Sequence, residues 1–183
     1  MAEGVINPWP YSVTLGRMGR SGLDLRFEPD AEARAAIAKT LNLVSLESLD
    51  AEVFLRPWLD GAEVSGLIRA RVVQLCSVSA DDFEEPIESR FSVRVLPADS
   101  ENSSPDESGD LALDPDGDDP PDVLDGETMD ISGYVIEHLA LELDPFPRKP
   151  GAVFEPPPEP VDLSPFAALK ALKADPEAGG EGT

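Results

Sequence analysis

Carboxylates are the most abundant reactive groups in this chain, and a pair of carboxylates can serve as general acid and general base. The chain holds 37 Asp and Glu against 14 Lys and Arg, which gives a formal net charge of -23. Catalysis needs such groups fixed in a pocket that shifts their pKa values. Many of the acids fall in residues 98–129, which contain no Lys or Arg and several Pro, Gly and Ser residues. That composition favours a solvated, disordered acidic insertion over a catalytic pair.

A metal site is the second chemistry that the acids suggest. Three aspartates are spaced like the first ligands of a calcium loop: Asp114, Asp116 and Asp118. The calcium-loop pattern continues with Gly at the sixth position and Glu at the twelfth, where this chain has Asp119 and Asp125. His138 and Cys76 are the only histidine and the only cysteine, so they cannot complete a zinc set. We therefore predict no metal, no cofactor and no catalytic residue.

Cys76 and His138 are better explained as structural residues than as ligands or catalytic groups. Cys76 lies at the end of a predicted strand, with no helix N-terminus or base beside it in the sequence, which favours a buried, inert thiol. His138 lies near the apolar side of a predicted helix, which indicates a residue at the edge of the core. One cysteine excludes an intramolecular disulfide, and the first residues lack an apolar secretory segment, so we expect a cytoplasmic location. No apolar run approaches the length of about 20 residues that a membrane span requires.

Basic side chains form two groups that could contact a partner. The first lies on the polar faces of two predicted strands: Arg69, Arg71, Arg90 and Arg94. If these strands pair, the arginines make either a positive patch for RNA or a ladder of salt bridges with Glu63 and Glu88. The second group, Arg148 and Lys149, lies in a Pro-rich segment. That segment either has a structural role or docks an acidic or phosphate partner.

The elements that position these residues follow from hydrophobic periodicity. Alternating patterns predict strands over residues 11–15, 22–27, 50–58, 63–76 and 87–96, each of the longer ones with one apolar face. A helix is expected after the second strand, and an amphipathic helix follows Asp130, with apolar positions at Ile131, Tyr134, Val135, His138 and Leu139. A short last helix is expected over residues 166–173, on which Phe166 begins the apolar side. The predicted fold is α+β, mainly an antiparallel sheet.

These elements suggest one domain over residues 1–154, with residues 98–129 as an insertion, followed by a Pro-rich strap, a short helix and a flexible tail over residues 155–183. Most of the acidic excess falls in the second half of the chain. Phosphate backbones repel such a surface, because non-specific nucleic-acid affinity comes from Lys and Arg. We therefore expect a basic protein as the direct partner, and neither DNA nor a membrane.

The chain resembles the bacterial YceD-like family of large ribosomal RNA subunit accumulation proteins. The resemblance lies in VVQLCSVSADDFEEPIESRFSVRVLP, the acidic spacer, DISGYVIEHLALELDPFPRKPGAVF and the closing SPFAALKALK. The LDPFPRKPG version is similar to an alphaproteobacterial-type branch. The positions of this chain that most resemble the family are Glu85, Pro86, Phe91, Leu143, Asp144, Pro145, Pro147 and Phe166. Many members carry a CxxC motif where this chain has Cys76 followed by Ser79, so a zinc-dependent role does not transfer to it.

The resemblance implies a non-enzymatic role in the synthesis, processing or stability of 23S rRNA during large-subunit assembly. Together with the charge, it suggests a large-subunit ribosomal protein as the basic partner, and a contact with the 23S rRNA precursor is the second possibility. A different class of function stays open, an acidic binding module or chaperone for a basic client unrelated to ribosomes. An enzyme, such as a metal-dependent nuclease, is the third hypothesis, but no spacing nominates its carboxylates.

Overall fold

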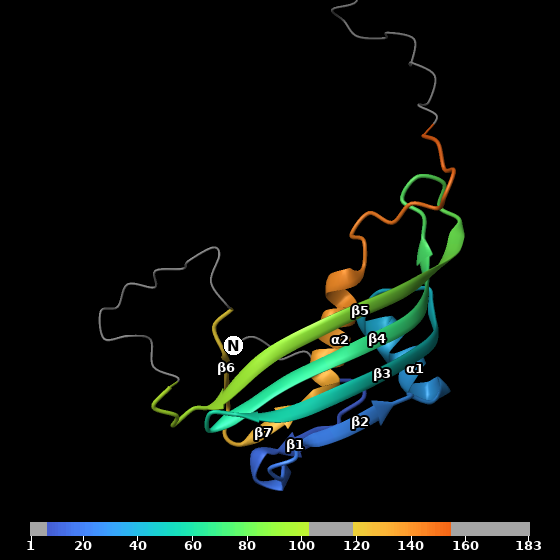
Figure 1. The fold of residues 1–183 in the computed structure, drawn as a ribbon. Coiled ribbons are helices and arrows are strands. Elements are labelled where there is room, and N and C mark those ends of the chain that lie inside the picture. The colour runs from blue at the N-terminus through green and yellow to red at the C-terminus, as the bar shows by residue number, and fades with distance from the viewer. Residues whose placement is uncertain (1–6, 103–118, 155–183) are drawn as a thin grey trace, which may run out of the picture. The chain divides into compact units, whose positions relative to one another are not determined.

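The computed structural model describes residues 7–102 and 119–154. By its contacts the chain divides into two units, residues 1–152 and 153–183, and nearly all described residues belong to the first. In this unit a twisted sheet carries both helices behind one face, while its other face is open to the viewer (Figure 1). The predicted fold class, α+β with a mainly antiparallel sheet, is confirmed. The short helix expected over residues 166–173 lies outside the described residues.

The elements follow one another along the chain as β1 (Ser12–Thr14), a 3-10 turn (Leu15–Arg17), β2 (Leu23–Phe27), α1 (Ala31–Thr40), β3 (Ser45–Trp58), β4 (Gly61–Leu75), β5 (Asp82–Pro97), β6 (Asp122–Leu124), β7 (Thr128–Asp130) and α2 (Ile131–Glu142). The main sheet has the order β2-β3-β4-β5-β6, and β1 pairs with β7 in a small separate sheet. All pairs are antiparallel apart from β5 and β6, which run parallel.

The core lies between the inner face of the sheet and the two helices. Alternate residues of β4 are buried there, from Val64 through Ile68 to Val72, because successive side chains of a strand point to opposite faces. The helix α2 covers β4 and β5 and buries Val135 and Leu139, while α1 packs on β3. The helices therefore cover one face of the sheet only. The opposite face is exposed to solvent, and this is where the polar side chains of the strands lie.

Two short strands correct the prediction for residues 98–129. The expected disordered insertion is wrong for its last part, because β6 and most of β7 lie within it. Leu124 is buried where β6 pairs with β5, and Met129 is fully buried where β7 pairs with β1. The strands β6 and β7 therefore form because β5 and β1 pair with them. The acidic sequence around them gives no sign of this pairing. Residues 103–118 lie outside the described part of the chain.

Candidate functional site

Two segments that are far apart in the sequence lie side by side at one end of the sheet (Figure 1). Residues 76–81 connect β4 to β5, and residues 144–152 follow α2. The Ser77 N–H donates to the Pro147 carbonyl at 2.8 Å, and Lys149 Nζ lies 3.3 Å from Asp81 Oδ2. We call these two segments together the tip. The Pro-rich segment that resembles the family is therefore fastened to the β4–β5 turn.

Cys76 is the buried centre of the tip, with 2% of its surface exposed. Its sulfur accepts hydrogen bonds from the backbone N–H groups of Val78, Ser79 and Lys149, each at 3.4 Å. The Ser79 side chain, followed by these backbone N–H groups, lowers the pKa of the Cys76 thiol to about 6, and burial opposes the shift. The predicted burial is confirmed. The lowered pKa was not foreseen, because it depends first on how the turn brings Ser79 back toward the sulfur and then on Lys149, which lies 73 positions along the chain.

The polar side chains of the tip carry both signs of charge. Hydrogen bonding from Lys149, assisted by Ser79, holds the pKa of the Asp81 carboxyl below its usual value. Arg148 is exposed, and the nearby Phe146 ring is 70% exposed. The Asp144 carboxylate accepts the Phe146 N–H at 2.8 Å, which tightens the turn that leaves α2. The tip thus presents a basic and an apolar side chain on a backbone fixed by hydrogen bonds.

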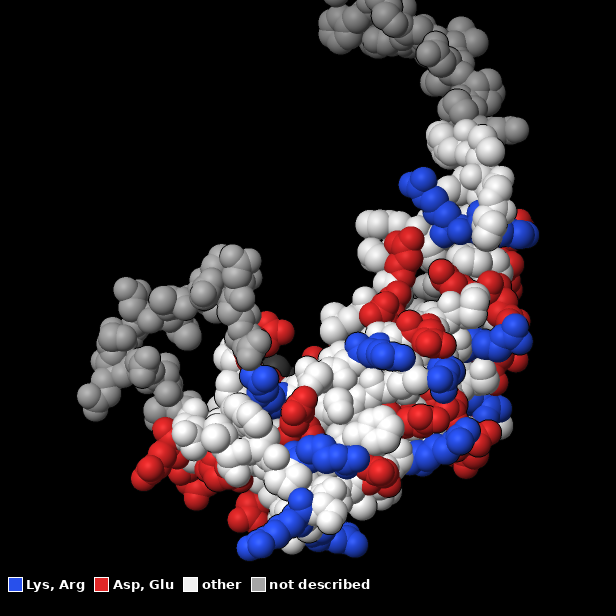
Figure 2. Space-filling model, viewed as in Figure 1, with Lys and Arg blue, Asp and Glu red and all other residues white. Residues whose placement is uncertain are grey.

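The four strand arginines all lie on the outer face of the sheet, where acidic and basic side chains are interspersed (Figure 2). Arg69 lies 3.4 Å from Glu88 and 3.9 Å from Glu52, and Arg71 lies 3.0 Å from Glu84. This face carries the arginines Arg26, Arg56, Arg69, Arg71, Arg90 and Arg94 and the acids Asp24, Asp50, Glu52, Glu63, Glu84 and Glu88. Of the two arrangements left open by the sequence, the structure contains the salt-bridge ladder.

The predicted partners of the ladder are only partly those observed. Glu88 does pair with Arg69, but Glu63 accepts a hydrogen bond from the Ser92 hydroxyl at 3.0 Å and lies opposite Arg94 in the register. The Arg94 guanidinium sits 5.2 Å from the centre of the Trp58 ring. Outer-face arginines are thus engaged by carboxylates and an aromatic ring.

The family-like residues of β5 lie on both faces of the strand. Phe91 is buried on the inner face and its ring stacks on His138 of α2, with centroids 4.4 Å apart. Glu85 is half-buried on the same face, whereas Pro86 is exposed on the outer face opposite Arg71. Phe91 is thus a packing residue that joins β5 to α2. Phe166 lies outside the described residues.

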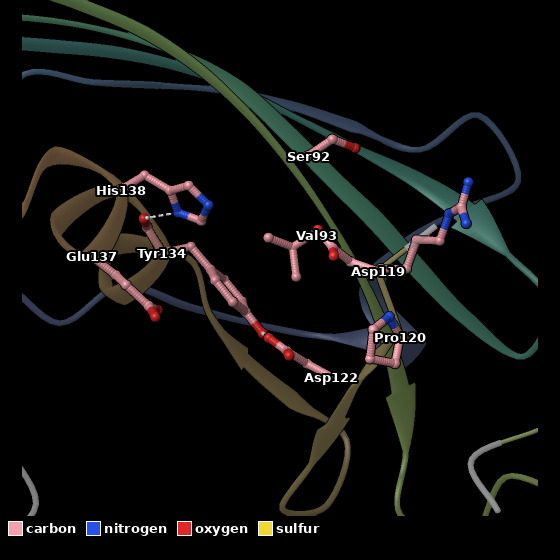
Figure 3. Close-up of a pocket in the computed structure, with 9 residues that line it drawn as sticks. Ser92, Val93, Asp119, Pro120, Asp122, Tyr134, Glu137 and His138 are labelled. Atoms are coloured by element: carbon pink, nitrogen blue, oxygen red, sulfur yellow. Dashed lines mark hydrogen bonds between the residues drawn. The ribbon is translucent and has the colours of Figure 1, made fainter. Parts of the chain in front are cut away.

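A cavity of about 560 Å³ opens between β5, the start of β6 and α2 (Figure 3). Within it the Tyr134 hydroxyl donates to Asp122 at 3.1 Å, and His138 Nδ1 bonds the Tyr134 carbonyl at 2.8 Å. Burial, followed by the negative charge of Asp122, raises the pKa of Tyr134 above its ordinary value. Asp119 and Glu137 also line this cavity. It is a polar cavity with more acidic than basic groups.

Two further observations concern the described residues as a whole. Within residues 7–102 and 119–154, no three His, Cys, Asp or Glu side chains stand close enough to hold a metal ion. None of the helices in this part of the chain has the length and apolar character to cross a membrane.

Comparison with known proteins places this geometry in a family. No curated protein and no solved structure matches the chain significantly. The family model described as large ribosomal RNA subunit accumulation protein YceD matches residues 64–173, which is more than half of the chain. The matched region contains most of β4, all of β5 and α2, both segments of the tip and the Phe91–His138 stack. The chain therefore belongs to the YceD family of large ribosomal RNA subunit accumulation proteins.

Proposed function

We propose that this protein is a non-enzymatic factor that supports the synthesis, processing or stability of 23S rRNA during assembly of the large ribosomal subunit in the cytoplasm. Membership of the YceD family, whose description names accumulation of large-subunit rRNA, is the observation that carries this proposal. The match includes the tip, so the most distinctive part of the structure belongs to the family region. The protein acts through its surface, as a binding partner.

The direct partner in this proposal is a basic protein, such as a large-subunit ribosomal protein. The formal net charge of -23 supports this choice, because opposite charges steer association and like charges oppose it. The ladder on the outer face supports it as well, since Arg69 and Arg71 already lie beside carboxylates. A direct contact with the 23S rRNA precursor is the second candidate, and the exposed Arg148 favours it. A basic client unrelated to ribosomes remains the alternative.

A pulse–chase experiment in depleted cells separates the three ways of supporting 23S rRNA. Labelled uridine is added to the native host with and without the protein, and the 23S, 16S and precursor bands are followed with time. A lower initial 23S signal indicates synthesis, an accumulating precursor indicates processing, and faster decay of mature 23S indicates stability. Unchanged kinetics of all bands would contradict the proposal, and restoration by the re-expressed full chain is the control.

A further inference from the structure

Gln74 is a buried polar side chain whose hydrogen-bonding capacity is incompletely used. It lies on the inner face of β4, two residues before Cys76, and only 7% of its surface is exposed. Its side-chain oxygen Oε1 is buried without a hydrogen-bond partner among the described residues. Buried polar atoms in folded proteins are nearly always paired, so an exception calls for an explanation.

This side chain lines a cavity of about 550 Å³. The cavity lies where three elements end, namely α1, β4 and α2, and its apolar walls include Leu41, Leu143 and Pro145. Its volume lies within the range of about 300–1,000 Å³ that is usual for ligand sites. A buried polar side chain in the wall of a partly apolar cavity is an arrangement by which binding sites fix the orientation of what they hold.

The polar residues that line the cavity include one acid and no base: Asn42, Gln74, Cys76, Ser77 and Asp144. Gln74 has an unpaired oxygen, Asp144 has a carboxylate, and hydrogen bonding, first of all from Ser79, lowers the pKa of the Cys76 thiol. The two basic residues of the tip, Arg148 and Lys149, do not line the cavity, and Lys149 is paired with Asp81. The one acidic residue that lines it, Asp144, is negative, which matches an occupant that donates hydrogen bonds and carries positive charge.

We propose that the cavity between the ends of α1, β4 and α2 binds an arginine side chain of a basic partner protein, with Gln74 as its buried acceptor. This inference rests on the basic partner in the proposed function. A guanidinium presents five N–H donors in one plane and is more weakly hydrated than an ammonium, so it suits several acceptors set in an apolar wall. The arginine stem would pack against Leu41, Leu143 and Pro145.

The chain contains two natural reporters of this cavity. Gln74 is the only glutamine and Cys76 the only cysteine of the sequence. In the full chain labelled with nitrogen-15 selectively at glutamine, the side-chain NH2 signals of Gln74 can therefore be followed alone, and alkylation reports on Cys76 alone. The probe is the peptide acetyl-Gly-Arg-Gly-amide. Its control contains citrulline, which keeps the shape of arginine but lacks the charge.

We expect the arginine peptide to shift the Gln74 NH2 signals in a saturable way and to slow alkylation of Cys76, while the citrulline peptide does neither. Gln74→Leu should weaken binding by about tenfold or more, because the buried acceptor is lost. Gln74→Glu, which keeps the shape and adds negative charge, should bind more tightly. Glu84→Gln is the matched control for general surface charge. It changes a carboxylate outside the cavity, on the outer face, and should leave the affinity unchanged.

Several results would overturn the inference. Equal shifts with citrulline would mean a neutral occupant, and equal affinity for a lysine peptide would remove the assignment to arginine. Unmoved Gln74 signals would mean that the oxygen is satisfied by a bound water alone. If the Gln74→Leu variant does not fold, the Gln74→Glu variant still tests the inference. Binding of the arginine peptide no tighter than in the wild type would then overturn it. Each result would leave the role in 23S accumulation untouched, because that role is tested by depletion in cells.

Discussion

Cys76 shows how one side chain takes its chemistry from segments that are distant in the sequence. Two of its N–H donors lie two and three residues ahead, and the third belongs to Lys149. Donors to sulfur stabilise the thiolate, and they outweigh the cost of burying its charge. The sequence places Cys76 at the end of a strand, but it does not show that the Pro-rich segment returns to it.

The lowered pKa of Cys76 predicts a pH dependence of stability. The pKa of the Cys76 thiol is about 6 in the native state, and that of a thiol in the unfolded chain is about 8.5, so ionisation of the thiol favours the native state. The free energy of unfolding should therefore rise as the pH goes from about 6 to about 8.5, and this gain is lost as the pH falls through 6. Urea unfolding of the wild type and of Cys76→Ser across that range measures it. Parallel pH profiles of the two proteins would contradict the assignment.

Gly66 tests the packing of the Phe91 side chain of β5 against β4. A Cβ on Gly66 would lie 2.5 Å from a carbon of the buried Phe91 ring and 3.0 Å from the Glu52 carbonyl. Gly66→Ala should lower the free energy of unfolding by about 1–3 kcal/mol, because a close-packed ring must move. Gly19→Ala is the matched control, since nothing lies within 4 Å of a Cβ there. Equal stability of the two variants in urea would mean that Phe91 does not pack on β4.

At the scale of elements, the start of α2 is held by a network that reaches back to the N-terminal segment. The Asp130 carboxylate accepts the Gly133 N–H at 3.0 Å and two hydrogen bonds from the Asn7 amide, and Ser132 donates to it as well. The Asp30 carboxylate of α1 accepts a single backbone N–H, that of Ala33, at 2.8 Å. The α2 cap thus fastens two parts of the fold at once.

Removal of each cap should therefore have unequal effects. Asp130→Ala should lower the free energy of unfolding by about 1–2 kcal/mol, at the upper end for a lost cap, because Asn7 and Ser132 lose their hydrogen bonds to this carboxylate too. Asp30→Ala should cost about 1 kcal/mol or less. Thermal unfolding followed by circular dichroism compares the two variants. A larger loss for Asp30→Ala would contradict the network.

The elements that sequence periodicity predicts are those with a continuous apolar face. The long alternations of β4 and β5 were therefore found, with the arginines correctly placed on a single polar face. The start of β3 at Ser45 was missed because a bulge between Leu46 and Ser48 interrupts the alternation. The strands β6 and β7 were missed because each has only three residues and depends on a distant partner.

The candidate site was predictable only in part, for the same reason. The family-like residues Asp144 and Pro147 were recognised from local sequence, yet their place beside Cys76 depends on the return of the chain after α2. The unpaired oxygen of Gln74 has no signal in the sequence, because the alternation of β4 predicts only that its side chain faces inward. Contacts between distant segments create both features.

At the scale of the whole molecule, charge is the property that selects a partner. The chain has a net charge of -23, while its outer sheet face alternates both signs. We therefore expect salt-sensitive binding of the full chain to at least one large-subunit ribosomal protein, because exposed charges are screened within about 8 Å at physiological ionic strength. Binding assays at about 50 and about 300 mM salt test this. Binding to none of these proteins would remove the basic-client mechanism.

The same reasoning predicts what arginine substitutions do to RNA affinity. Replacing Arg69 and Arg71 by Gln should leave the affinity for a 23S rRNA fragment and its salt dependence unchanged, because both side chains already lie beside carboxylates. Fluorescence anisotropy at several salt concentrations measures both quantities. A weaker affinity with a flatter salt slope would instead support direct RNA contact through the outer face.

The ratio of 23S to 16S rRNA in cells of the native host depleted of this protein tests the central claim most directly. Total RNA and sucrose-gradient fractions are compared before depletion, after it, and after the full chain is re-expressed. A role in large-subunit rRNA accumulation predicts a selective fall in 23S rRNA and in large-subunit particles, with recovery on re-expression. An unchanged ratio, with an unchanged particle profile, would contradict the account.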